Sequence, residues 1–390
     1  MNIKNKVVGN IDTKLKIQRI IGDVKGSKGT PTVIFFGGIH GNELAGVKAL
    51  QKVYTVMVEK EIPLVGNFYA ISGNIQAIEK NERFVDVDLN RIWTKDALAN
   101  TTNTNFTEYN ERTSIYKVIK EIVAIEAGPF YFIDLHTTSS ETNPFITISD
   151  SLNNRKFSNV FAMPTVLGIE EYLEGPLLTF INEFGHVALG FEAGQHYNET
   201  SIDNCVAFIW LALEASGCIA KSEIEKYDFH KHYLSFFNDV QDFYEIKYKY
   251  QIGKQERFAM LDGFTNFETI TKHQKLAISN GSIVGSPMEG KIFMPLYQQQ
   301  GDDGFFIITR IPRFWLYLSI LVRTLKLYHV LRILPGIKQD NRDTYTLIVN
   351  PKTARFLTTQ IFHLFGFRKK SIQNNRWYFT RRDRKINAFI

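Results

Sequence analysis

The stretch Thr30-Pro-Thr-Val-Ile-Phe-Phe-Gly-Gly-Ile-His40-Gly-Asn-Glu43 decides the fold class of this 390-residue chain. Its nearly continuous apolar run, closed by two glycines, is typical of a strand buried on both faces of a sheet. Residues 44–58 then place apolar side chains at helical spacing, and residues 65–71 again have the composition of a buried strand. We expect this order of strand, helix and strand to belong to an α/β sheet with helices on both faces.

The same alternation continues along the first half of the chain. Residues 115–127 predict a helix that ends at Gly128-Pro129, residues 130–135 and 187–191 predict buried strands, and residues 201–216 predict a further helix. Alternating residues at 243–252 and frequent glycines after them predict a small β-rich region. We therefore expect three parts: a main α/β domain over 1–227, a β-rich domain over 228–310 and an extension over 311–390.

Composition excludes several classes of protein. The chain is 44% hydrophobic and 22% charged, which is typical of a folded globular protein. Its only cysteines, Cys205 and Cys218, exclude a disulfide scaffold, a four-cysteine zinc site and an all-cysteine iron–sulfur cluster. The first residues lack the apolar run of a secretory signal, and no long uncharged apolar stretch follows, so we expect a cytoplasmic protein.

Charge is distributed unevenly. From Arg310 to Ile390 there are 17 Lys and Arg residues against three acids, whereas the preceding residues carry 29 against 37. A basic tail of this kind binds nucleic acid or an anionic membrane in some proteins, but we expect it to dock on the acidic main body. Within it, the apolar segment 314–322 is too short to span a bilayer, and we expect it to pack on the main body rather than lie on a membrane.

The first candidate for chemistry is the segment His40-Gly-Asn-Glu43, directly after the buried strand. At a spacing of three residues an imidazole and a carboxylate lie on one side of a turn and are able to bind one zinc ion. Ligands in open α/β sheets also bind at the carboxyl ends of strands. A surface histidine next to an ordinary helix-terminal carboxylate remains the alternative.

A third zinc ligand is available at the end of another apolar strand. His136 follows Phe132-Ile-Asp-Leu, and Asp134 lies two residues before it, placed to accept a hydrogen bond or to contact the metal-bound water. Two histidines and one glutamate leave a fourth position of zinc open for water, as catalytic sites require. A polar strand end without metal is the alternative.

Hydrolysis also needs a general base and groups that bind substrate. Glu192 follows Leu189-Gly-Phe191 at a predicted strand end and fits the role of the base, unless it simply faces solvent. Arg91 and Asn90 are candidates to bind a substrate carboxylate, and Arg83 to polarise the scissile carbonyl. Alternatively, Arg91 pairs with Asp86 or Asp88 as part of the structure.

Taken together, these motifs resemble the succinylglutamate desuccinylase/aspartoacylase family of zinc carboxypeptidase-like enzymes. The resemblance rests on four segments in the same order and spacing: Gly37-Gly-Ile-His40-Gly-Asn-Glu43, Arg83 with Asp88-Leu-Asn-Arg91, Asp134-Leu-His136-Thr-Thr-Ser, and Gly190-Phe-Glu192-Ala-Gly. It covers about residues 30–300 and says little about the extension.

The resemblance implies a three-layer α/β/α domain with a mixed sheet and a smaller β-rich domain that closes the site. It further implies one zinc ion per chain held by His40, Glu43 and His136, activation of the water by Glu192, and substrate binding by Arg83, Asn90 and Arg91. Tyr297 corresponds loosely to a tyrosine that the second domain contributes in such enzymes. An additional arginine about ten residues before the catalytic glutamate is missing near Thr179 and Asn182, which argues against N-acetylaspartate as substrate.

The resulting hypothesis is a zinc-dependent hydrolase that cleaves the amide bond of a small N-acyl amino acid or a similar carboxylate-bearing amide. The alternatives are a zinc metallocarboxypeptidase acting on peptides, and a non-catalytic protein that binds nucleic acid or lipid through its basic tail. The motifs GxSxG and GxGxxG are absent, which removes the usual sequence arguments for a serine hydrolase or a dinucleotide-binding enzyme. The chain is a possible homo-oligomer, and His186 and His196 are expected to be structural histidines whose hydrogen bonds are satisfied.

Overall fold

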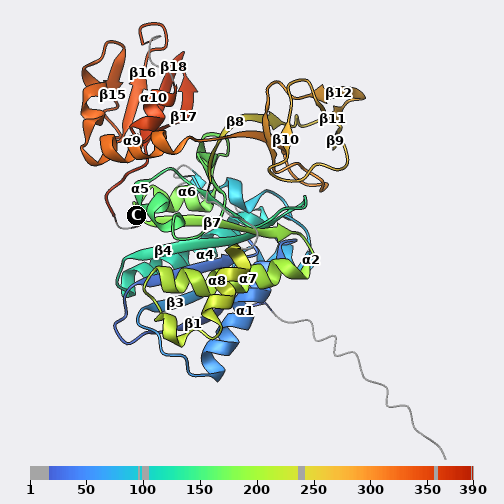
Figure 1. The fold of residues 1–390 in the computed structure, drawn as a ribbon, viewed down its shortest axis with the longest axis vertical. Coiled ribbons are helices and arrows are strands. Elements are labelled where there is room, and N and C mark those ends of the chain that lie inside the picture. The colour runs from blue at the N-terminus through green and yellow to red at the C-terminus, as the bar shows by residue number, and fades with distance from the viewer. Residues whose placement is uncertain are drawn as a thin grey trace, which may run out of the picture.

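The protein is described here by a computed structural model that covers residues 17–94, 97–98, 105–235, 242–354, 359–387 and 389. Residues 1–16, from which we expect no secretory signal, lie outside the described residues. Figure 1 shows an α/β body from which a β-rich part and a separate carboxyl-terminal part extend on the same side.

One mixed sheet of 11 strands runs through the α/β body and into the β-rich part. Neighbouring strands are parallel from β3 through β2 and β4 to β7 and from β5 through β6 to β8, and antiparallel at the other positions. In spatial order the strands are β1 (Ile20–Val24), β3 (Asn67–Ser72), β2 (Thr32–Gly37), β4 (Phe130–Thr138), β7 (Val187–Gln195), β5 (Phe145–Ile148), β6 (Thr165–Leu167), β8 (Phe243–Gln251), β14 (Asp303–Arg310), β13 (Gly290–Phe293) and β10 (Thr269–Ile270).

Two hydrophobic cores lie on the two faces of the body's sheet. Strand β2 separates them, because Val33 and Phe35 point to one core and Ile34 and Phe36 to the other. The first core is covered by α1 (Leu44–Glu59) and α7 (Glu199–Ala215), the second by α4 (Thr107–Ile125) and α6 (Leu177–Asn182). The predicted three-layer α/β/α arrangement is therefore confirmed, and a strand buried on both faces explains the continuous apolar run in the sequence.

Shorter elements complete the body and the β-rich part. The body also contains α2 (Ile75–Lys80), η1 (Leu89–Arg91), α5 (Leu152–Ser158), η2 (Ile169–Glu171), η3 (Lys221–Glu223) and α8 (Tyr227–Ser235). A three-stranded sheet in the order β12 (Ser282–Gly285), β11 (Lys275–Ser279) and β9 (Phe258–Met260) stands beside the end of the large sheet. The β-rich character expected after residue 228 is confirmed, while the exact domain limits stay a prediction.

The carboxyl-terminal extension has a fold of its own, which the sequence did not predict. Four antiparallel strands in the order β15 (Ile337–Gln339), β16 (Thr346–Val349), β18 (Arg376–Arg381) and β17 (Phe367–Gln373) form a sheet. Helices α9 (Arg313–Thr324) and α10 (Thr359–Leu364) and the 3-10 helix η4 (Leu327–Ile333) accompany it (Figure 1). A separate small core, which includes Leu347, Phe362 and Phe379, joins the sheet to α10 and η4.

Buried ion pairs join the extension to the body. Asp150, which is fully buried after β5, accepts hydrogen bonds from Arg155 of the body and from Arg323 and Arg368 of the extension. These guanidinium groups hold the pKa of Asp150 well below its usual range, against the opposing effect of burial. The prediction that basic residues of the tail dock on acidic residues of the body is confirmed for this cluster.

The last described residue returns to the core of the body. The side chain of Phe389 is buried in the second core, where it packs on Phe184 and stacks on the imidazole of His186. His186 is buried, and neither ring nitrogen has a hydrogen-bond partner within the described part of the chain. Expecting a hydrogen-bonded structural histidine was therefore wrong for His186, whereas His196 does form hydrogen bonds.

The burial of His186 predicts a stability that depends on pH. Burial lowers its pKa from 6.5 to about 4, so between these values the unfolded chain binds a proton that the folded chain does not. Stability is then expected to fall as the pH falls from 6.5 to about 4, by up to about 3 kcal/mol from this group. In urea unfolding across this range, the free energy of unfolding should depend less steeply on pH for His186→Phe than for the natural chain. The exposed His232 on α8 provides the matched control, because His232→Phe should leave the slope unchanged.

Among the described residues, no single helix has the length and apolar composition to cross a membrane. Helices α9 and η4 pass that test only as a pair, and the pair is bent by 80°.

Candidate metal centre and active-site cavity

The loop after β2 places two of the candidate ligands. Gly38 adopts a left-handed backbone conformation with φ of 73°, and a Cβ atom there would lie 2.6 Å from Ile78, so the tight turn requires glycine. His40 lies in this loop, and Glu43 stands at the amino end of α1 without making a capping hydrogen bond. The Glu43 side chain is directed to the two histidines instead.

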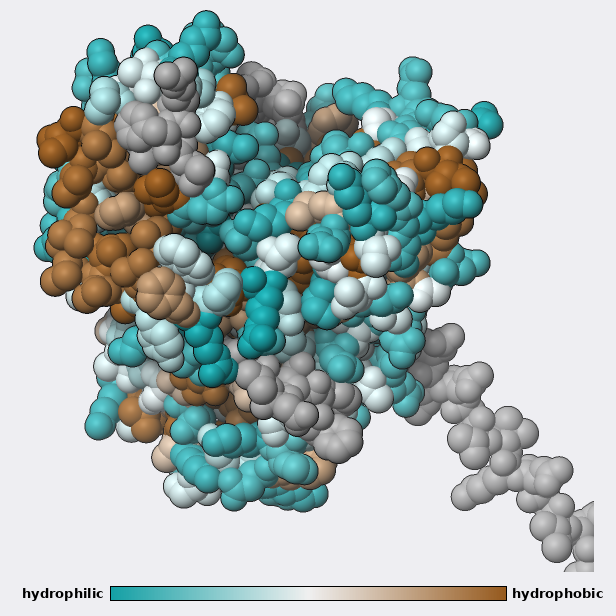
Figure 2. All heavy atoms as spheres, turned by 45° about the horizontal axis from the view of Figure 1, so that its top comes forward, coloured by the Kyte–Doolittle hydropathy of each residue, from teal (hydrophilic) through white to brown (hydrophobic). Residues whose placement is uncertain are grey.

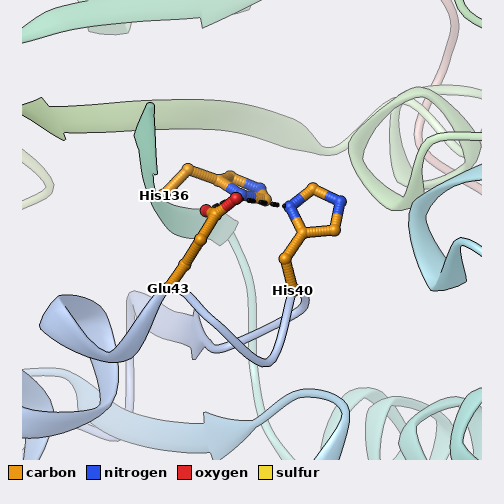
Figure 3. A group of neighbouring side chains, drawn as sticks. All are labelled: His40, Glu43 and His136. Carbon is orange, nitrogen blue, oxygen red and sulfur yellow. Dashed lines mark hydrogen bonds and ion pairs between the residues drawn. The ribbon is translucent and has the colours of Figure 1, made fainter. Parts of the chain in front are cut away.

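The third candidate ligand comes from the neighbouring strand. Strands β2 and β4 are parallel, with Gly37 opposite Leu135, so the residues that follow Gly37 approach His136. Glu43 lies between the two imidazoles: its Oε1 is 2.8 Å from His40 Nδ1, and its Oε2 is 2.9 Å from His136 Nδ1 (Figure 3). Sequence segments about 93 residues apart thus converge as the strand-end argument predicts.

The donor set of this cluster fits zinc. All three side chains are buried, and one ligand atom from each lies within 4.8 Å of the others. Two imidazole nitrogens and one carboxylate oxygen form a typical set of protein ligands for a catalytic zinc ion. Asp134 Oδ2 lies 2.6 Å from His136 Nε2 and orients that ring from behind, as carboxylates beside zinc-binding histidines do.

The charges around Glu43 favour its ionised form. Burial by itself would raise the pKa of this carboxyl group, yet the facing His40 and His136 bring the pKa well below its usual range. Its Oε2 also accepts a hydrogen bond from the backbone N–H of Thr137 at 3.0 Å. A deprotonated Glu43 is the form that a metal ion needs.

Glu192 lies on the next strand. In the register of β4 and β7 it is directly opposite His136. Its side chain is buried, and Oε2 has no hydrogen-bond partner within the part of the chain that is described. Burial raises the pKa of Glu192 to about 8. A carboxyl group with a pKa near neutrality is suited to accept a proton and later return it.

The arginines predicted to bind substrate lie in the same cavity but have different partners from those expected. Arg83 Nη2 donates to Asp88 Oδ2 at 3.0 Å, and Nη1 lies 3.5 Å from Glu43 Oε1. Arg91 Nη2 donates to Asp303 Oδ2 of β14 at 2.8 Å. The alternative in which Arg91 pairs with Asp86 or Asp88 is therefore wrong, because Arg91 pairs with Asp303 and Arg83 pairs with Asp88.

Asn90 has a structural contact. Its Oδ1 accepts a hydrogen bond from the backbone N–H of Leu177, at the start of α6. This contact holds the loop that carries Arg91 against the helix, while Asn90 still lines the cavity.

A cavity of about 450 Å³ connects these groups. Its wall includes residues of the β-rich part, such as Leu296, Gln298 and Asp303, which sequence reasoning missed because nothing in their local pattern marks them. The predicted residues that line the cavity are His40, Glu43, Arg83, Asn90, Arg91, His136 and Glu192.

Tyr297 is not brought to this cavity. Its hydroxyl group donates to the carbonyl of Leu261 and accepts from the N–H of Phe264, and its ring borders a different hollow. The adjacent Gln298 points to the site instead, where its Oε1 lies 3.2 Å from His196 Nε2 and accepts from Asn42. In a strand-flanking segment neighbouring side chains point in opposite directions, so a shift of one residue exchanges them.

Part of the cavity wall is apolar. The region where the sequence lacks an arginine contributes Leu178 and Thr179. Further apolar side chains come from several elements: Ile148, Ile169, Leu173, Met294 and Phe306. The cavity wall therefore combines the candidate metal ligands with apolar residues suited to an apolar group.

Fold and site together define an α/β protein with a candidate metal centre at the carboxyl ends of adjacent parallel strands. Residues 29–209 match the family model described as "Succinylglutamate desuccinylase/Aspartoacylase catalytic domain", and this part of the chain belongs to that family. The matched residues contain every predicted site residue except Tyr297.

Curated relatives match over limited lengths. An aspartoacylase of Xenopus tropicalis is 32% identical over 120 residues, which are 30% of this chain and 38% of the relative. A succinylglutamate desuccinylase of Photorhabdus laumondii is 29% identical over 143 residues, which are 34% of this chain and 42% of the relative. The chain thus spans about two fifths of the length of these relatives.

Solved structures share the fold more widely. The succinylglutamate desuccinylase of Vibrio parahaemolyticus superposes with a TM-score of 0.56 at 12% identity, covering 75% of this chain and 91% of that chain. The product-bound ectoine utilization protein EutE of Ruegeria pomeroyi gives a TM-score of 0.55 at 17% identity, covering 74% and 87%. At these identities the likeness establishes the fold.

Proposed function

We propose that this protein is a zinc-dependent hydrolase that cleaves the amide bond of a small N-acyl amino acid. The observation that carries the proposal is the convergence of His40, Glu43 and His136 in one cavity with the buried carboxyl group of Glu192. The relatives named as a desuccinylase and an aspartoacylase support the same class of reaction.

His40, Glu43 and His136 would hold the zinc ion. When bound, zinc supplies a Lewis acid that polarises a carbonyl oxygen and acidifies a water molecule. Asp134 fixes the ring of His136 in the orientation needed for binding.

The other residues of the cavity have distinct roles. Glu192 takes the proton from the attacking water and delivers it to the leaving amine nitrogen. The guanidinium of Arg83 stabilises the negative charge that develops on the scissile carbonyl oxygen. Arg91 binds the carboxylate of the amino acid, with Asp303 limiting how strongly it attracts an anion.

The cavity also suggests the kind of substrate. The apolar side chains in the wall, among them Leu178, Ile148 and Phe306, suit an apolar acyl group or an apolar amino-acid side chain. Residues of the β-rich part close the cavity to about 450 Å³, a size that fits a small molecule better than an extended peptide.

A substrate panel tests the proposal. Zinc-loaded protein is incubated with N-acetyl, N-succinyl and longer N-acyl derivatives of aspartate, glutamate, leucine and phenylalanine, and with dipeptides and longer peptides. We expect release of free amine from N-acyl amino acids that carry an apolar group, loss of this activity with a chelator, and its return with zinc. Faster cleavage of peptides would favour the metallocarboxypeptidase alternative, and no cleavage of any compound by protein with stoichiometric zinc would overturn the proposal.

A further inference from the structure

Helix α9 of the extension buries two polar residues, Ser319 and Arg323, and exposes most of its apolar residues. Ser319 Oγ donates to the carbonyl of Leu364, and the buried Arg323 donates to Asp150 and Asp383. On the opposite face Phe314 is 65% exposed and Tyr317 is 69% exposed. Leu316 nevertheless packs against the first core of the body, and Val322 is buried. The expectation that segment 314–322 packs on the main body is therefore confirmed for Leu316, whereas most of the apolar side chains of the segment stay exposed.

The exposed apolar residues continue beyond the helix. The 3-10 helix η4 turns by 80° from α9, and Ile333 at its end is 81% exposed. Figure 2 shows the result as a broad hydrophobic patch on the extension. We call this surface the apolar face; its exposed residues are Phe314, Trp315, Tyr317, Ile320, Leu321, Leu325, Leu327, Val330 and Ile333. A contiguous patch of this kind marks an interaction site in most proteins that have one.

The charges around the apolar face are positive. Residues 304–339 contain six Lys and Arg residues and no acid. Beside η4 a hollow of about 300 Å³ is lined by basic side chains, among them Lys326, Arg381 and Lys385. The only acid in its wall, Asp383, is already bound by Arg323. The face therefore joins an apolar surface to a site that attracts anions.

We propose that the apolar face docks this protein on an anionic lipid bilayer, with α9 and η4 in the interfacial layer and the basic hollow next to lipid headgroups. Aromatic and aliphatic residues with Lys and Arg at the margins are the composition of helices that lie in a membrane interface. With 12 residues, α9 is about 18 Å long, well short of the roughly 30 Å hydrocarbon core, so it lies on the membrane rather than crossing it.

The distribution of charge favours an anionic bilayer, rather than a second copy of the chain, as the partner of the apolar face. In a symmetric dimer the same surface faces itself, so the basic residues would meet basic residues. An anionic bilayer instead attracts the extension and repels residues 1–309, in which acids outnumber Lys and Arg. The membrane thus also sets the orientation of the body, which is held to the extension through Asp150.

Vesicle co-sedimentation of the full chain tests the proposal. We compare phosphatidylcholine vesicles with vesicles that contain about a quarter phosphatidylglycerol. The natural chain should sediment with the anionic vesicles, bind neutral ones far less, and be released as salt rises from about 0.1 M to about 0.5 M. Leu321→Glu should weaken binding by about tenfold or more, whereas Ile125→Glu, at a similarly exposed apolar position on the body, should not.

Two further readouts do not depend on the variants. Trp315 is half-exposed, so its fluorescence in the natural chain should shift to the blue on binding anionic vesicles. Lack of sedimentation with anionic vesicles would overturn the proposal. So would a dimer that Leu321→Glu dissociates, or salt-dependent binding to duplex DNA in place of vesicles. None of these readouts involves hydrolysis, so the result is independent of the proposed reaction.

Discussion

Glu192→Gln is expected to reduce kcat by about 10³-fold while zinc remains bound. Glutamine has nearly the same shape as glutamate, so it fits the buried position on β7 without a cavity, but its amide cannot take a proton from water. His40, Glu43 and His136 are unchanged, so the zinc content should stay at one ion per chain. Steady-state kinetics with the best compound of the panel, together with zinc analysis of the purified protein, measure both quantities.

The matched control is Glu199→Gln, an exposed glutamate at the start of α7, only seven positions further on in the chain. Its kcat should equal that of the natural chain. Activity of Glu192→Gln within about tenfold of the natural chain would remove Glu192 from the role of general base. Loss of zinc together with activity would instead indicate that Glu192 supports the metal site.

The largest effect on stability is expected for Asp150→Asn. Asp150 is fully buried and joins Arg155, Arg323 and Arg368. An amide at this position removes the carboxylate that pairs with Arg155 among the described residues, and it leaves Arg323 with Asp383 alone and Arg368 with Glu171 alone. Removing one partner of a buried ion pair costs about 3–5 kcal/mol. Urea unfolding, followed by tryptophan fluorescence, should show this loss of unfolding free energy, and the first transition should include separation of the extension.

A comparison at the surface shows whether burial is the cause. Asp203→Asn on α7 removes a carboxylate that is exposed and 3.9 Å from Lys52, so its effect should be within about 0.5 kcal/mol. The pKa of Asp150 lies well below 3.8 in the folded chain, so its contribution is complete above that pH and is lost as the pH falls below it. A loss of less than about 1 kcal/mol for Asp150→Asn would contradict the account.

Local patterns were sufficient to predict the centre of the fold. The strands β2, β4 and β7 are continuous apolar runs, and each ends in a chemically distinctive residue or loop. Because parallel strands place their carboxyl ends together, the convergence of His40, Glu43 and His136 followed from the order of the motifs. Their roles as ligands remain a prediction that zinc analysis tests.

What the sequence did not predict depends on contacts between distant parts of the chain. Arg91 and Asp303 are 212 positions apart, and no local feature pairs them. Three of the four strands in the sheet of the extension are short and contain Lys or Arg, which weakens their apolar alternation. The exposed apolar face of α9 was missed because an apolar segment alone does not reveal how much of its surface packs on the rest of the protein.

The return of Phe389 to the body has a consequence for synthesis. During synthesis, residues 17–235, which form the α/β body, emerge from the exit tunnel of the ribosome long before Phe389 does. Until then His186, Phe184 and Phe180 lack the aromatic ring that covers them in the finished structure. Part of the core of the nascent body therefore stays uncovered while the β-rich part and the extension are made, and its packing is completed only after Phe389 has been synthesised.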